Sequence, residues 1–124
     1  MIKITITSGP LAGRTRAMPA EMNPHEMFAS LTAHGDQWSV DYSAATEEEV
    51  FLWFRAELIT RIVRALQEGW PVKFLDQEFH LEAGGDLYSV GQTIEDVIVA
   101  SGRMITIDSD DEEGLVVGVR GYEM

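Results

Sequence analysis

Cysteine is absent from this sequence of 124 residues. The chain therefore has no disulfide framework, no thiolate metal ligand and no cysteine nucleophile. Apolar runs are also short, and none approaches the roughly 18 residues that indicate a membrane-spanning helix. The opening, Met1 to Thr7, alternates apolar and polar residues and lacks the apolar run of a secretory signal. We therefore expect a cytoplasmic protein that does not enter a membrane.

Basic residues are scarce. Lys and Arg number 9 against 21 Asp and Glu, which gives a formal net charge of −12. A field of this sign repels nucleic acid and anionic lipid, so neither is an expected partner. Residues 1–20, however, contain Lys3, Arg14 and Arg16 and no acidic residue. We predict that this cationic segment docks on the anionic remainder or marks a contact surface, with Arg14 and Arg16 as candidate binding residues.

The apolar content is sufficient for one core. The hydrophobic fraction is 45%, which is ordinary for a globular protein. A length of 124 residues is close to the commonest size of one domain, and no linker, repeat or low-complexity tract interrupts it. We therefore predict a single domain over residues 1–124.

Start, stop and alternation signals predict the elements. Helices are expected from the N-cap at Asn23 to Gly35, from Thr46 to Leu66 or Gln67, and from Ser89 to Gly102. Short alternating segments between them predict strands, in the overall order ββαβαββαββ. Because neighbouring strands mostly form hairpins, we expect an α+β fold: a mainly antiparallel sheet with three helices packed largely on one face.

Two residues break the pattern of the long helix. Placing its residues about 100° apart gives an apolar arc of about 180°, wider than one sheet contact needs, which favours a homodimer. Arg55 falls inside this arc, so we expect its charge to pair with an internal acid or to anchor an anionic ligand. Trp53 projects from the polar face, and an exposed tryptophan is typical of an interface. Arg55 and Trp53 are therefore candidate binding residues.

Glu78, His80 and Glu82 lie at alternate positions of a predicted strand and so share one face. Carboxylate, imidazole and carboxylate in this order could hold a metal ion or relay protons. A solvated outer face of a sheet produces the same pattern. The densest acidic cluster, residues 108–113, does not fit the spacing of a calcium loop, so we predict a solvated turn there. The sequence predicts no cofactor.

Taken as a whole, the sequence favours a non-enzymatic adaptor or regulatory protein that binds a protein partner and self-associates. One alternative is a small-molecule or metal-dependent enzyme that uses His80 with Glu78 and Glu82. Another is an acidic inhibitor or chaperone of a basic partner. A concave pocket around His80 would favour the enzyme, whereas an exposed apolar patch or open strand edge would favour the adaptor.

Overall fold

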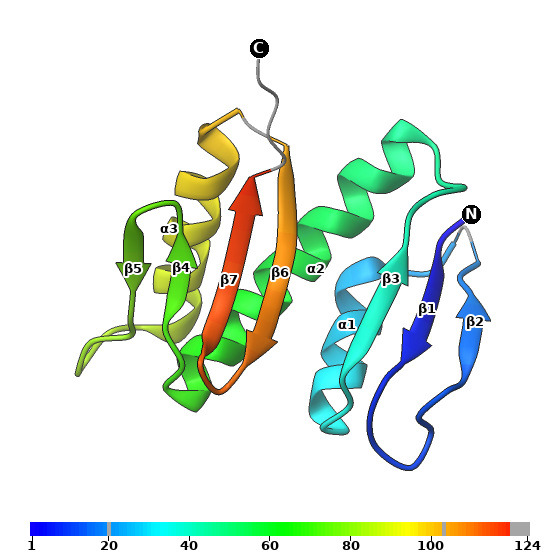
Figure 1. Cartoon of the computed structure of the whole chain (residues 1–124), viewed down its shortest axis with the longest axis horizontal. Helices are drawn as coiled ribbons and strands as arrows, with labels where there is room; N and C mark the ends of the chain where they lie inside the picture. Colours follow the sequence, from blue (N-terminus) through cyan, green and yellow to red (C-terminus); the bar gives the residue numbers. More distant parts are fainter. Residues whose placement is uncertain (20, 103, 120–124) are drawn as a thin grey trace. The chain divides into compact units, whose positions relative to one another are not determined.

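The computed structural model describes residues 1–19, 21–102 and 104–119 (Figure 1). Within these residues the elements follow the order ββαβαββαββ, so the predicted α+β class and element order are confirmed. Contacts divide the chain into two compact units, unit 1 at Met1–Thr60 and unit 2 at Arg61–Met124. None of the helices in the described part of the chain has both the length and the apolar character needed to cross a membrane.

Unit 1 contains an antiparallel sheet of β1 (Lys3–Ile6), β2 (Thr15–Ala17) and β3 (Trp38–Asp41), in the order β2-β1-β3. It also contains α1 (Pro24–Ala33) and the first part of α2 (Glu47–Glu68). The core forms around Phe28, whose ring centroid lies 5.6 Å from that of Trp38 and 5.8 Å from that of Trp53. Alternate residues of the first strand, Ile2, Ile4 and Ile6, complete this core, as their period-two pattern predicts.

Helix α1 begins and ends where the sequence predicts. The Asn23 side chain caps its first turn by accepting two backbone N–H groups, and Pro24 occupies the first helical position. At the other end Gly35 adopts a φ of 76°, and the Asp36 N–H donates to the Leu31 carbonyl over 3.0 Å. This closure, a Schellman motif, fixes the backbone that follows the helix.

Unit 2 contains β4 (Val72–Phe74), β5 (Gln77–Phe79), α3 (Leu87–Ala100), β6 (Ile105–Asp111) and β7 (Gly114–Val119). Its described strands form a second sheet in the order β5-β4-β7-β6, in which β4 and β7 run parallel. The strands thus form two sheets in the described chain, and two pairings, β1 with β3 and β4 with β7, do not join consecutive strands. A prediction based on hairpins pairs only strands that are neighbours in the sequence, whereas β7 pairs with β4 after the crossover through α3.

The acidic segment 108–113 differs from its prediction as a solvated turn. Strand β6 continues to Asp111, and a bulge lies between Ile107 and Ser109. Because the bulge shifts the alternation by one residue, Asp110 pairs with the buried Leu115 and lies on the inner face of the sheet. The prediction of a solvated turn is therefore wrong for Asp110.

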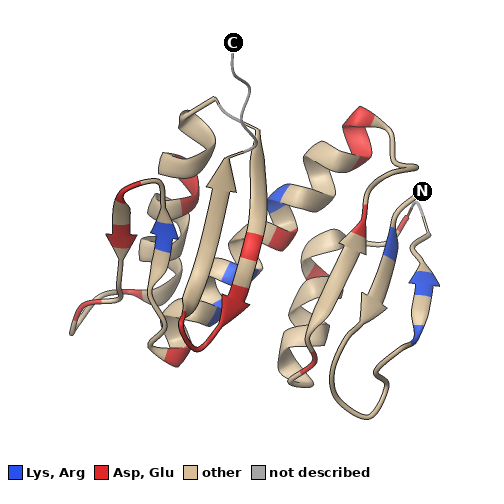
Figure 2. Ribbon diagram, in the orientation of Figure 1, with Lys and Arg blue, Asp and Glu red and all other residues tan. Residues whose placement is uncertain are grey.

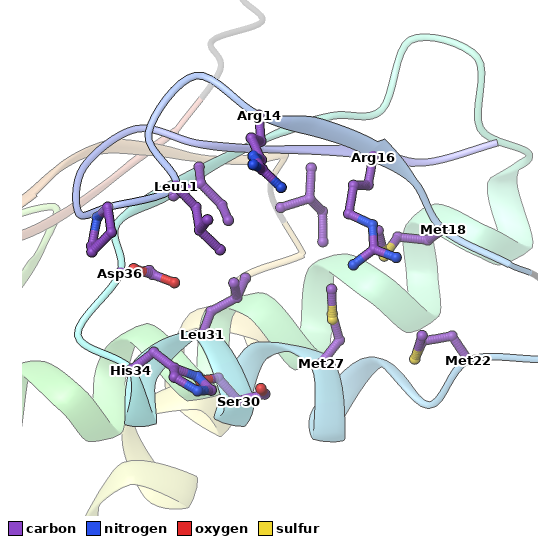
Figure 3. Close-up of a pocket in the computed structure, with 13 residues that line it drawn as sticks. Leu11, Arg14, Arg16, Met18, Met22, Met27, Ser30, Leu31, His34 and Asp36 are labelled. Atoms are coloured by element: carbon purple, nitrogen blue, oxygen red, sulfur yellow. The ribbon is translucent and has the colours of Figure 1, made fainter.

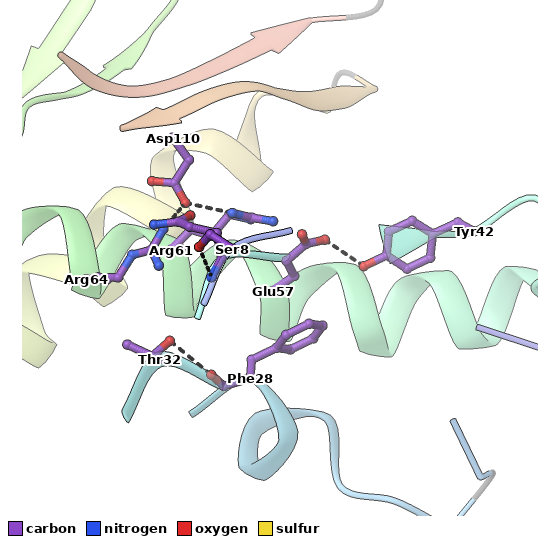
Figure 4. A network of polar contacts seen from close by, with 9 residues as sticks. Ser8, Phe28, Thr32, Tyr42, Glu57, Arg61, Arg64 and Asp110 are labelled. Atoms are coloured by element: carbon purple, nitrogen blue, oxygen red, sulfur yellow. Dashed lines mark hydrogen bonds and ion pairs between the residues drawn. The ribbon is translucent and has the colours of Figure 1, made fainter. Parts of the chain in front are cut away.

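Asp110 joins a buried ion cluster within unit 2 (Figure 4). Its Oδ2 accepts hydrogen bonds from Arg61 over 2.6 Å and from Arg64 over 2.5 Å, and all three side chains are buried. The Arg64 guanidinium also lies 5.8 Å from the centroid of the Trp70 ring. A buried cluster of this kind is strongly destabilised when one partner is removed, so it holds β6 to the end of α2.

Candidate functional site

A cavity of about 570 Å³ opens in unit 1 between β2 and α1 (Figure 3). Ile4 of β1 is buried, whereas all three residues of the edge strand β2 are exposed. Arg16 lies directly opposite Ile4 in the ladder, so its side chain leaves the sheet on the same face. We call this cavity the β2 groove.

The floor of the β2 groove is rich in methionine. Met18 follows β2, Met22 precedes α1 and Met27 lies in its first turns, and all three are half-buried against the core of unit 1. Methionine is unbranched and polarizable, so it adapts its shape to an apolar surface placed against it. Met-rich surfaces are accordingly common where a protein accepts apolar side chains of a partner.

Arg14 and Arg16, the two arginines predicted as binding residues, both line the β2 groove. Figure 2 shows their positive charge at β2, and Figure 3 shows both side chains at the groove. Neither guanidinium has a hydrogen bond or ion pair with any residue that the structure describes. Their charges are therefore available to an anion from outside the chain. Within the described part, neither arginine docks on an acidic residue, whereas the Met1 amino group of the same segment pairs with Glu49 over 3.0 Å.

Asp36 lines the opposite end of the groove, and sequence reasoning missed it. The residue is only 5% exposed. Its carboxylate forms no hydrogen bond or ion pair within the described chain. A Cβ at Gly9 would lie 2.7 Å from Asp36 Oδ1, so the glycine leaves the space that this carboxylate fills. Nothing in the sequence distinguishes Asp36 from an ordinary polar residue after a helix, because Gly9 is remote along the chain.

Trp53 is not exposed, and this prediction is wrong. The side chain is 5% exposed and packs edge-on against Phe28 in the core of unit 1. The apolar residues Phe51 and Leu52, which the arc predicts to be buried, are instead 61% and 54% exposed. The predicted arc is correct for Leu58, Ile62, Ala65 and Leu66, which are buried. It is wrong for the first turns of α2, where Trp53, a large side chain that removes much apolar surface from water, is buried instead.

Arg55 does not lie in a buried apolar arc either. It is half-buried, and its guanidinium lies 5.8 Å from the centroid of the exposed Phe51 ring. The buried arginines of α2 are Arg61 and Arg64, which lie on the side that the sequence assigns to solvent. Arg55 therefore contributes a cation–aromatic contact rather than a buried charge.

Glu78 and His80 come together without forming a metal site. His80 Nε2 lies 2.7 Å from Glu78 Oε2, and both side chains are about half exposed. Strand β5 ends at Phe79, so the strand alternation does not extend to His80 and Glu82. Across the described residues, no group of three or more His, Cys, Asp and Glu side chains is placed to hold a metal ion. The geometry gives the enzyme alternative no support.

The chain matches no protein-family model, and neither curated proteins nor solved structures give a match. What the candidate site can bind therefore follows from the chemistry of the residues that form it. An apolar floor, a pair of arginines and a buried carboxylate make the β2 groove suited to binding.

Proposed function

We propose that this protein is a non-enzymatic interaction protein, and that it binds an extended, acidic segment of a partner protein along β2 and over the β2 groove. The observation that carries the proposal is the coincidence of a cationic edge strand with a methionine-lined cavity directly beside it. Strand addition of this kind combines main-chain hydrogen bonds with recognition of alternate side chains.

The backbone of β2 supports strand addition. The Met18 N–H donates to the Ile2 carbonyl over 2.8 Å, and the Ile6 N–H donates to the Arg14 carbonyl over 2.9 Å. In an antiparallel ladder, residues that bond to one neighbour alternate with residues whose N–H and C=O point away from it. Thr15 and Ala17 therefore present their backbone groups to the open edge, where an added strand can bond to them.

The charge of an added strand decides whether it can pair with the open edge of β2. A second copy of β2 placed against the first would bring Arg14 and Arg16 close to the same arginines, and like charges across strands are destabilising. An acidic segment would instead place carboxylates beside both guanidiniums. Its alternate apolar side chains would enter the groove, whose volume of about 570 Å³ lies in the range of ordinary binding pockets.

The test uses a fluorescein-labelled peptide of alternating pattern, with leucine and glutamate on one face and threonine on the other, and a twin with lysine in place of glutamate. We expect the protein to bind the glutamate peptide at least about tenfold more tightly, measured by fluorescence anisotropy. Arg16→Glu should remove this preference. Lys3→Glu is the matched control, since Lys3 is adjacent to Ile4 on β1 and so lies on the opposite face.

Equal binding of the two peptides, or equal effects of Arg16→Glu and Lys3→Glu, would contradict the proposal. Binding of the apolar anionic dye anilinonaphthalene sulfonate without binding of either peptide would also contradict it. That result would indicate a small-molecule site in the groove rather than a peptide site.

Self-association is the second part of the proposed function. The observation that favours it is the pair of adjacent, exposed apolar residues on α2, Phe51 and Leu52. Large apolar side chains exposed side by side are typical of contact surfaces. Light scattering at micromolar concentration should report about twice the mass of one chain, and Phe51→Glu should restore the mass of one chain. A single-chain mass at every concentration would contradict this part alone.

A further inference from the structure

The Asp36 carboxylate lies in an environment that is unfavourable for an isolated charge. The residue is 95% buried, because only 5% of its surface is exposed, and no described side chain pairs with it. Moving a charge away from water without a partner is destabilising. The carboxylate also follows the C-terminus of α1, where the helix dipole places partial negative charge. Both effects would be relieved by a positive group in the groove.

Asp36 is held in this position by the surrounding backbone. Its own N–H closes the Schellman motif of α1 on Leu31. The next residue, Gln37, donates its N–H to Ser8 Oγ over 3.2 Å and accepts the Thr7 N–H over 2.9 Å. These contacts fix the backbone that carries the carboxylate, and Figure 3 shows the carboxylate pointing into the cavity.

The cationic groups that line the same groove do not neutralise it. Arg14 and Arg16 form no ion pair with a described residue. The His34 ring is engaged elsewhere, with Nδ1 2.8 Å from the Ser30 carbonyl oxygen. The groove thus contains a negatively charged carboxylate and two positively charged guanidiniums that do not pair with one another.

Their order along the groove follows from the ladder. Arg16 lies opposite Ile4, Arg14 bonds to Ile6, and Gln37 bonds to Thr7, the residue that follows β1. Measured along the strands, Asp36, beside Gln37, therefore lies beyond the Arg14 end of β2. It precedes β3, on the side of β1 away from the open edge of β2, so a segment added along β2 reaches Asp36 only with a side chain that extends across the groove.

We propose that Asp36 recognises a lysine or arginine side chain of the bound segment. This inference rests on the proposed function and names the charge pattern of the partner. On its groove-facing side the segment carries acidic residues beside Arg14 and Arg16, and a basic residue beyond them on the Arg14 side. A segment with a further acidic residue at that position is rejected, because it would meet the Asp36 carboxylate in a poorly solvated site.

The test extends the glutamate peptide by one groove-facing position on the Arg14 side and compares lysine, norleucine and glutamate there. Norleucine has the unbranched apolar stem of lysine without its charge. We expect the lysine peptide to bind about tenfold more tightly than the norleucine peptide, and the glutamate peptide to bind most weakly. This comparison uses the unaltered protein, so it does not depend on how any variant folds.

Asp36→Asn tests the assignment to this residue. We expect the variant to bind the lysine and norleucine peptides within about twofold of each other. Its midpoint of thermal unfolding should stay the same or rise, because the substitution removes an uncompensated charge. A structural role would instead lower the midpoint and weaken all three peptides equally.

Two outcomes separate this inference from the function on which it rests. If the unaltered protein prefers the glutamate peptide to its lysine twin but binds the lysine and norleucine extensions equally, the role of Asp36 is wrong and the proposed function stands. If no peptide of either set binds, the proposed function is wrong and the inference is wrong with it.

Discussion

Two groups of charged side chains, one in each unit, differ in whether their members pair with one another. In unit 2, Arg61 and Arg64 share one carboxylate oxygen of Asp110, and all three side chains are buried. In unit 1, Arg14, Arg16 and Asp36 line one groove and form no ion pair with the described residues. Paired buried charges are what a structural role requires, whereas charges kept apart in a cavity indicate a site for something external. This contrast supports the proposal of a binding role for the charges of unit 1 and a structural role for those of unit 2.

The largest expected effect lies in unit 2. Asp110→Asn removes the negative charge between two buried guanidiniums, and breaking a buried pair in this way costs about 3–5 kcal/mol of unfolding free energy. Urea denaturation at neutral pH measures the loss. Glu112→Gln, in the exposed turn after β6, is the control and should change stability by less than about 0.5 kcal/mol. Similar losses of unfolding free energy in both variants would show that the buried ion cluster does not stabilise unit 2 more than an exposed charge does.

A smaller effect is expected in the groove of unit 1. Replacing Arg14 and Arg16 together by Ala removes two charges that have no described partner, so stability should change by less than about 1 kcal/mol. The same urea denaturation measures it, and the variant should lose its preference for the glutamate peptide. A loss as large as that of Asp110→Asn would show that these arginines support the fold, and would end the contrast between the units.

The smallest effect on stability is expected at an exposed carboxylate that already accepts hydrogen bonds. Asp86 caps α3, and the hydrogen bonds from Ser89 hold the pKa of its carboxyl below the usual value near 3.8. A lowered pKa in the folded state means that the ionised cap adds stability above about pH 4, and that this stability is lost as the pH falls. The stability difference between the protein and Asp86→Ala should therefore shrink between about pH 6 and about pH 3. A constant difference would show that the ionised form contributes nothing.

Local signals made much of the fold predictable. The cap at Asn23 and the left-handed Gly35 act within a few residues of themselves, so sequence alone locates α1. Thr46 likewise accepts the Glu49 N–H while Glu49 accepts the Thr46 N–H, the reciprocal pair that starts α2. The element order followed from such signals.

Features that depend on distant residues were not predictable. The parallel pairing of β4 with β7 joins strands separated by α3, and no local pattern specifies it. The buried side of the first turns of α2 was misplaced, because Trp53 packs in the core while Phe51 and Leu52 are exposed. Of the candidate site, the sequence suggested Arg14 and Arg16 by their charge. It did not suggest Asp36, whose surroundings depend on Gly9.

The bulge in β6 changes how sequences related to this one should be compared. In a strand without the bulge, Ser109 and the residues after it would point to the opposite face of the sheet. The number of residues between the start of β6 and an acidic residue therefore does not tell which face that residue occupies. The position of the acidic residue relative to β7 does tell which face it occupies, because Asp110 pairs with Leu115. An alignment that counts forward from Ile105 would treat an inward acid as a surface residue. Counting backward from the turn at 112–113 identifies the equivalent of Asp110 even where the upstream strand has gained or lost a residue.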